Sequence, residues 1–178
     1  MLPTGGFVRL DEYGDFQCPA CAAVAVVIRQ LQQIYGSQLK VTFFHFPLAI
    51  HPHAREAALA AEAASLQGHF SEMHDLLYQN QAIWSEAPNV QKLFDSYARS
   101  LGLDLSQFRA DYESKEVAAR IASDQKRGQA LGVKNTPTLF VNDREVPPPF
   151  RLERLRREID AALTQTPPRK LGVDSGLR

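Results

Sequence analysis

Apolar and polar residues alternate soon after the start of the chain, which is the pattern of a half-buried strand. Residues 7–13, Phe-Val-Arg-Leu-Asp-Glu-Tyr, begin with this alternation, and Gly14 and Asp15 then interrupt it. The composition turns alanine-rich and helical over residues 19–35 and becomes strand-like again over residues 39–46. The order strand, helix, strand predicts a βαβ unit.

Almost every pattern between residues 51 and 131 is helical. Pro52 suits the first position of a helix that ends at Gly68. Apolar residues recur at three- and four-residue spacing most clearly over residues 90–101, with a proline before them and a glycine after. The other helices expected in this block cover residues 70–77, 105–112 and 114–131.

Strand signals return only near the end of the chain. Residues 138–141, Thr-Leu-Phe-Val, predict a strand, and Asn142-Asp143 predicts a turn into a short edge strand at 144–146. A last helix is expected over residues 150–163. The polar, glycine-containing stretch from Pro167 predicts a flexible tail. A helical block thus interrupts an α/β scaffold, and no linker divides the chain into independent domains.

Composition excludes several classes of partner. The chain has 178 residues and a formal net charge of zero, so no nucleic acid or anionic membrane is expected as an obligatory partner. No apolar run approaches the roughly 20 residues of a membrane span. The first residues show no basic region followed by an apolar stretch, so no signal peptide is predicted within this sequence.

The two cysteines form the motif Cys18-Pro19-Ala20-Cys21 at the predicted junction of first strand and helix. A disulfide across so short a loop would remove little entropy from the unfolded chain, under ~2 kcal/mol, so structural stapling is a poor explanation. A helix N-terminus favours a thiolate, and Pro19 fits the first helical position. We therefore predict that Cys18 is an exposed nucleophile and that Cys21 is a partly buried resolving thiol.

A zinc site is the alternative use of these cysteines. Cys18 and Cys21, together with His45, His51 and His53, contain enough ligand types. The spacing argues against zinc, since there is no second Cys-x-x-Cys and no helical pair of histidines three to five residues apart. We expect no metal, and no bound cofactor either, because the cysteine pair would itself carry the chemistry.

Four segments of the chain are informative together: residues 11–21 around the cysteines, 46–48 with 51–54, 68–70 with 73–77, and Asn135-Thr136-Pro137-Thr138. They resemble DsbA-like proteins of the thioredoxin fold, and the likeness runs from about Val8 to Leu163. The resemblance implies a thioredoxin-like α/β fold in one domain over residues 1–166, with the tail at 167–178. The all-helical insertion, at about 51–131, would separate the βαβ unit from a C-terminal ββα unit.

The resemblance also implies roles for residues outside the motif. Pro137 would be cis and lie beside Cys18, and Thr136 would offer its backbone to an extended substrate peptide. Glu12, on the strand that enters the site, would accept the proton of the resolving thiol Cys21. The alternative for Glu12 is an exposed strand carboxylate without a role.

Pro19 and Ala20, between the cysteines, are expected to contribute to substrate binding. Ala20 stands where the strong oxidants of the family carry a histidine that can stabilise the thiolate. The direction of electron flow is therefore open, and the protein is predicted to be a dithiol oxidase or an isomerase, with a reductase as the further possibility.

The expected substrates are protein thiols and disulfides, and an unidentified redox partner is expected to recycle the cysteine pair. A membrane protein is one candidate for that partner, or for an anchor to which this chain is tethered. One alternative is a glutathione-dependent transferase or isomerase of the same fold, and another is a redox-sensing or binding domain of a larger membrane protein. The resemblance suggests a periplasmic or otherwise extracytoplasmic location, with a cytoplasmic one as the alternative.

Overall fold

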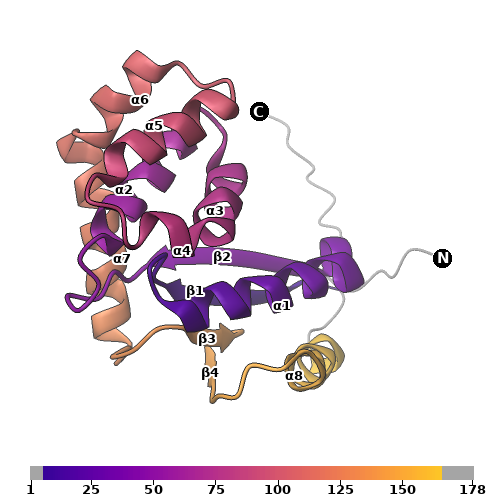
Figure 1. Cartoon of the computed structure of the whole chain (residues 1–178). Coiled ribbons are helices and arrows are strands. Elements are labelled where there is room, and N and C mark those ends of the chain that lie inside the picture. Colours follow the sequence, from indigo (N-terminus) through magenta and orange to yellow (C-terminus); the bar gives the residue numbers. More distant parts are fainter. Residues whose placement is uncertain (1–5, 166–178) are drawn as a thin grey trace, which may run out of the picture.

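A four-stranded mixed sheet forms the centre of the molecule in the computed structural model, which describes residues 6–165 (Figure 1). The strands lie in the order β2-β1-β3-β4. β1 pairs in parallel with β2 and antiparallel with β3, and β3 pairs antiparallel with β4. The strand bounds are Val8–Gly14 (β1), Leu39–His45 (β2), Thr138–Val141 (β3) and Arg144–Val146 (β4).

Two helices, α1 (Pro19–Tyr35) and α8 (Leu152–Gln165), pack side by side against one face of the sheet. A short 3₁₀ helix, Gly36–Gln38, connects α1 to β2. The helical block stacks at one end of the sheet (Figure 1). Its helices are α2 (Ala54–Ser65), α3 (Phe70–Gln79), α4 (Gln81–Trp84), α5 (Val90–Ser100), α6 (Leu105–Tyr112) and α7 (Lys115–Ala130). The predicted order of a βαβ unit, a helical insertion and a ββα unit is confirmed.

The core is divided among clusters that follow this layering. One cluster joins α1 and α8 to the sheet, with Leu10, Leu31 and Leu155 fully buried. A larger cluster fills the helical block and extends under the start of α1 through Phe16 and Cys21. Burial of this apolar surface is the main force that holds the insertion against the α/β unit.

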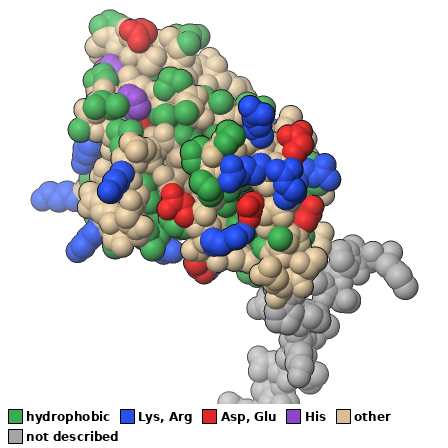
Figure 2. Space-filling model, turned by 90° about the horizontal axis from the view of Figure 1, so that it is seen from below, with side chains coloured by type: hydrophobic (Ala, Val, Ile, Leu, Met, Phe, Trp, Pro, Cys, Tyr) green, Lys and Arg blue, Asp and Glu red, His purple; other side chains and the backbone are tan. Residues whose placement is uncertain are grey.

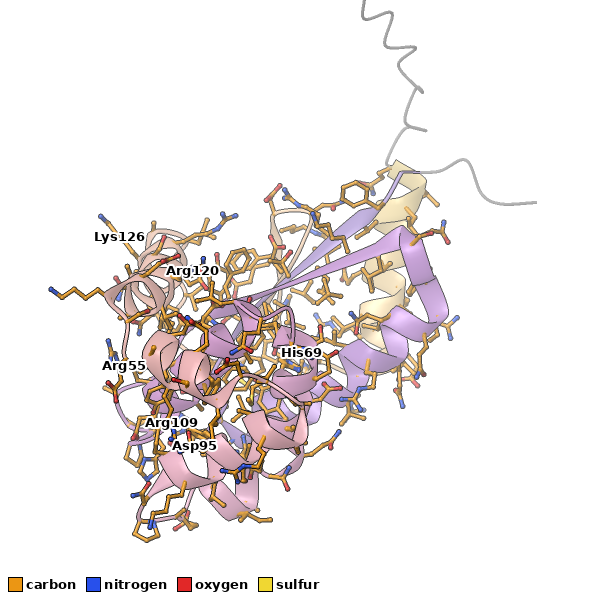
Figure 3. All side chains as sticks on the ribbon, turned by 90° about the horizontal axis from the view of Figure 1, so that it is seen from above. Arg55, His69, Asp95, Arg109, Arg120 and Lys126 are labelled. Atoms are coloured by element: carbon orange, nitrogen blue, oxygen red, sulfur yellow. The ribbon has the colours of Figure 1, made fainter. Side chains whose placement is uncertain are left out.

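Side-chain pairs add order to the helical block. Asp95 on α5 accepts hydrogen bonds from the Arg109 guanidinium on α6, at 2.7 Å from Nη2 (Figure 3). On the face that carries β4 and α8, Lys and Arg side chains are accompanied by Asp and Glu (Figure 2). This mixed charge agrees with the zero net charge of the sequence.

Local expectations were wrong at the end of β1 and at the start of α2. Gly14 does not interrupt β1 but pairs with His45, and a Cβ atom there would lie 2.3 Å from the Phe43 ring, so only glycine fits. Pro52 does not begin a helix, because α2 starts at Ala54. The residues before it are held in a turn, in which the His51 N–H donates to the Leu48 carbonyl at 3.0 Å.

Other differences are smaller. The four-residue helix α4 was not predicted, because one turn is too short to show periodicity. The last helix begins and ends two residues later than residues 150–163. The flexible tail predicted at residues 167–178 lies outside the described residues, and the single domain over residues 1–166 stays a prediction. No helix within residues 6–165 is long and apolar enough to cross a membrane.

Candidate active site

The two cysteines lie at the N-terminus of α1, as the sequence predicts. Cys18 is the N-cap residue, and Pro19 occupies the first turn, where its missing N–H costs no hydrogen bond. The Cys18 N–H donates to the Asp15 carbonyl at 3.1 Å, which turns the chain from β1 into the helix. Both thiols are free, so this is the reduced form of the pair.

Both sulfur-bearing residues are more buried than expected. Cys18 is 6 % exposed rather than open to solvent, because the loop before β3 brings the Thr136 carbonyl to 3.4 Å from its Sγ. Cys21 is fully buried rather than partly buried, since it packs into the core of the helical block. Pro19 and Ala20, between them, are exposed.

The environment separates the acidities of the two thiols. A hydrogen bond from the Cys21 thiol is the main cause that lowers the pKa of Cys18 to about 5, against the opposing effect of burial. The backbone N–H groups of Ala20 and Cys21 stabilise the Cys18 thiolate further. Burial, followed by the hydrogen bond to Cys18, raises the pKa of Cys21 far above its ordinary value. Cys18 is therefore a thiolate at neutral pH while Cys21 keeps its proton.

Glu12 is buried below this pair. Glu12 pairs with Leu139 on β3, and directly opposite residues of antiparallel strands point to the same face of the sheet. Leu139 packs in the cluster with α1, so the Glu12 side chain points to the face that α1 covers. It is 2 % exposed, and its Oε1 has no hydrogen-bond partner among the described residues. Burial raises the pKa of Glu12 to about 8, with a smaller contribution from the charge of Cys18. The alternative of an exposed strand carboxylate is wrong, while the predicted role as a base stays a prediction.

The structure brings the remaining predicted residues to the same place. The peptide bond between Thr136 and Pro137 is cis. Thr136 contacts Cys18 although the two residues are 118 positions apart in the chain. Thr136 and Pro137 are half-buried, whereas Pro19 and Ala20 are exposed.

Sequence reasoning missed the group that holds the active-site loop. The fully buried Asp15 carboxylate accepts hydrogen bonds from the Gln17 and Leu48 N–H groups, at 2.7 and 2.8 Å, and lies 2.7 Å from His51 Nδ1. Asp15 and His51 follow β1 and β2, whose parallel ends meet at one edge of the sheet. That topology was the available signal for their contact.

A second missed contact comes from the insertion. The Gln81 amide on α4 donates to the carbonyls of Phe16, at 2.6 Å, and Cys18, at 3.0 Å. No sequence signal pointed to this contact, because α4 itself was not predicted.

The histidines considered as zinc ligands are engaged with carboxylates. His45 Nε2 lies 3.0 Å from Glu62, and His51 and His53 lie near Asp15 and Glu56. In the part of the chain that the structure describes, no group of three or more His, Cys, Asp or Glu side chains is arranged to hold a metal ion.

Comparison with known sequences identifies a family and a set of relatives that are longer proteins. The family described as thioredoxin matches residues 7–161. The chain is 39 % identical over 156 residues to the Na(+)/H(+) antiporter NhaA 3 of Salinispora tropica, which covers 87 % of this chain and 23 % of the antiporter. It is 38 % identical over 159 residues to NhaA 1 of Mycolicibacterium gilvum, covering 86 % and 25 %. The chain thus spans about a quarter of the length of these relatives.

Solved structures share the fold over most of both chains. A thioredoxin-like oxidoreductase from Silicibacter pomeroyi is 28 % identical, with a TM-score of 0.75 over 89 % of this chain and 87 % of that one. BdbD from Bacillus subtilis is 21 % identical, with a TM-score of 0.78 and 88 % of each chain covered. DsbA from Xylella fastidiosa is 20 % identical, with a TM-score of 0.70 over 92 % and 88 %.

Proposed function

Because this chain belongs to the thioredoxin family and has the DsbA-like fold, we propose that it exchanges disulfides with protein substrates through Cys18 and Cys21. The observation that carries the proposal is the contrast between the two sulfurs. One is a stabilised thiolate at a helix N-terminus, and the other is a buried thiol within hydrogen-bonding contact of it. An attacking group and a resolving group are the two parts that thiol–disulfide exchange requires.

The reaction runs as two exchanges. In the oxidised protein the Cys18–Cys21 disulfide is attacked at Cys18 Sγ by a substrate thiolate, so a mixed disulfide forms and Cys21 leaves as a thiolate that takes up a proton. A second substrate thiolate then attacks the substrate sulfur of the mixed disulfide. Cys18 leaves as a thiolate, the substrate gains a disulfide, and the protein gains the two electrons.

Glu12 is the proposed source and acceptor of the Cys21 proton. It lies close enough for its charge to raise the pKa of Cys21, and its own pKa of about 8 lets it exchange a proton near neutrality. Thr136 is proposed to present its backbone to an extended substrate peptide. The exposed Pro19 and Ala20 would form the adjoining part of the docking surface, with Pro137 opposite.

The low pKa of Cys18 supports the oxidising direction. A protein that stabilises the thiolate stabilises its reduced form, and its disulfide is then a stronger oxidant. The surroundings of Cys18 thus stabilise its thiolate, as we expect a histidine at the position of Ala20 to do in strongly oxidising members of the family. We propose a dithiol oxidase or isomerase that works in an oxidising compartment, such as the periplasm, and that a separate redox partner recycles.

The reduction potential of the Cys18–Cys21 pair tests this function. We expect equilibration in graded glutathione buffers, with free thiols counted by alkylation and mass shift, to give a value between about −120 and −180 mV. The Cys18→Ser variant should form no intramolecular disulfide and should show no thiol–disulfide exchange activity. A value below the cytosolic glutathione poise of about −220 to −260 mV would instead assign the protein as a reductant, and full activity of Cys18→Ser would remove the proposed chemistry.

The relatives favour a second role, as a redox-responsive module that works with a membrane transporter. The observation behind it is that the antiporters match this chain over about a quarter of their length. A Cys21→Ser variant, which cannot resolve mixed disulfides, should then capture an integral membrane protein in native membranes. Capture of only water-soluble proteins would argue for the first role alone.

A further inference from the structure

A half-open cavity of about 560 Å³ lies beside β2 and is lined by residues of β1, β2, α1, α2 and α3, whose arrangement can be followed in Figure 1. This volume falls within the roughly 300–1,000 Å³ of pockets that bind small molecules. Pro19 and Ala20 are not part of its wall, and the disulfide exchange described above uses only one residue of that wall, Glu12.

The charged and titratable side chains of the cavity wall are mainly acidic. Glu12, Glu62 and Asp75 line it, against one guanidinium, Arg29. Two of the carboxylates are already paired within the protein. Glu62 lies 3.0 Å from His45 and 3.5 Å from Arg120, and Asp75 lies 2.7 Å from Arg29 and 3.1 Å from His74. Figure 3 shows Arg120 on the helical block.

Glu12 differs from these two carboxylates. It is almost fully buried at the cavity wall, and its Oε1 lacks any hydrogen-bond partner in residues 6–165. A buried carboxylate without a partner is costly in its ionised form, and burial accordingly raises its pKa. A cation placed in the cavity would supply the missing counter-charge.

The rest of the wall suits an organic cation better than a metal ion. Ile28 and Val41 provide aliphatic surface, and Phe43 and Phe70 provide aromatic rings that attract ammonium groups. Three metal-ligating side chains do not converge anywhere in the described part of the chain. The wall thus combines one unpaired acid with apolar surface.

We propose that this cavity binds a small organic ammonium ion, with its charged group against Glu12 and its apolar body between α1, β2 and α3. This site lies beyond the disulfide exchange proposed above and does not depend on it.

Calorimetric titration with benzylammonium, and with benzyl alcohol as its neutral counterpart of similar size, tests the proposal. We expect saturable binding of benzylammonium at a single site. The affinity for the alcohol should be lower by a factor of about ten or more. Glu12→Gln should lose about tenfold in benzylammonium affinity, whereas Glu72→Gln, exposed on α3 and outside the cavity wall, should bind as the unaltered protein does.

A second variant tests the volume of the cavity separately from the charge of Glu12. Ala25→Leu fills the cavity from α1 while it leaves Glu12 in place, and it should abolish binding even if Glu12→Gln proves to be misfolded. Equal binding of the alcohol and the ammonium, unchanged binding by Glu12→Gln, or no saturable binding of benzylammonium would each overturn the proposal. The readout is a heat of binding, so it stands apart from any failure of the thiol–disulfide activity.

Discussion

At the scale of single residues, the reactivity of Cys18 depends on one donor. The Cys21 thiol is the largest cause of the lowered Cys18 pKa. Cys21→Ala removes that donor, whereas Cys21→Ser keeps a hydroxyl in its place. A hydrogen bond to a charged group contributes about 1.5–3 kcal/mol, so we expect the Cys18 pKa to rise by about 1–2 units in Cys21→Ala and by less in Cys21→Ser. Thiolate absorbance followed against pH measures both, and identical midpoints would contradict this account.

A second prediction concerns how stability depends on pH, because the pKa of Glu12 is raised in the folded protein. A carboxyl group whose pKa is about 8 in the folded protein and 4.5 in the unfolded chain stabilises the fold below pH 4.5, and it loses that contribution as pH rises through about 8. Glu12→Gln should therefore unfold at a higher temperature than the unaltered protein at pH 8, and the difference should shrink as pH falls towards 4.5.

The same variant tests the role of Glu12 as a base. The rate at which Cys21 resolves a mixed disulfide should rise with pH through about 8 in the unaltered protein, as Glu12 loses its proton. This inflection should be absent from Glu12→Gln. Stopped-flow rates of a preformed mixed disulfide measure it, and an unchanged profile would leave Glu12 as a buried group without a catalytic part.

At the scale of elements, the short helix α4 positions the redox motif. The Gln81 amide joins it to the carbonyls of Phe16 and Cys18, one on each side of the turn into α1. Gln17 adds a further link, since its amide donates to the Ser85 carbonyl at 3.3 Å. The insertion is therefore in direct contact with the reactive loop.

Gln81→Met removes these two hydrogen bonds with little change in side-chain length. We expect a loss of about 1 kcal/mol in unfolding free energy and a rise of about half a unit in the pKa of Cys18, because the loop holds the thiolate less closely to its donors. Gln79→Met, at an exposed position on α3, is the matched control. Denaturant unfolding and thiolate titration are the measurements, and equal thiolate midpoints for the two variants would show that α4 has no positioning role.

At the scale of the whole molecule, α1 couples the two large parts of the core. Ala25 packs in the cluster of the helical block, and Ile28 and Leu31 pack in the cluster with the sheet and α8. Because one helix carries both faces, we expect the insertion and the α/β unit to unfold together.

Leu155→Ala tests this coupling. Leu155 is fully buried on α8, so its truncation should cost about 2–5 kcal/mol. The chain has a single tryptophan, Trp84, which lies in the helical block. Its fluorescence should shift to the same lower denaturant midpoint as the circular dichroism signal, and Arg157→Ala, exposed on the same helix, should shift neither. Separate midpoints in Leu155→Ala would show two units of independent stability.

Sequence alone determined the features that depend on local pattern. Alternation and helical periodicity gave the βαβ unit, most of the helical block and the final ββα unit, since each pattern is repeated within a few residues. The position of Cys18 and Cys21 at a helix start followed from Pro19 and the preceding strand. These features needed no knowledge of what packs against each element.

The tertiary structure alone decided how the site is enclosed. Cys18 is covered by Thr136 from far along the chain, and Cys21 and Glu12 are buried by elements from the insertion and from α1. The burial and electrostatic environment of a residue depend on contacts with residues that are distant in sequence, so local periodicity does not predict them. The same reason explains why the contacts of Asp15 and Gln81 and the cavity beside Glu12 emerged only when the helices were placed around the sheet.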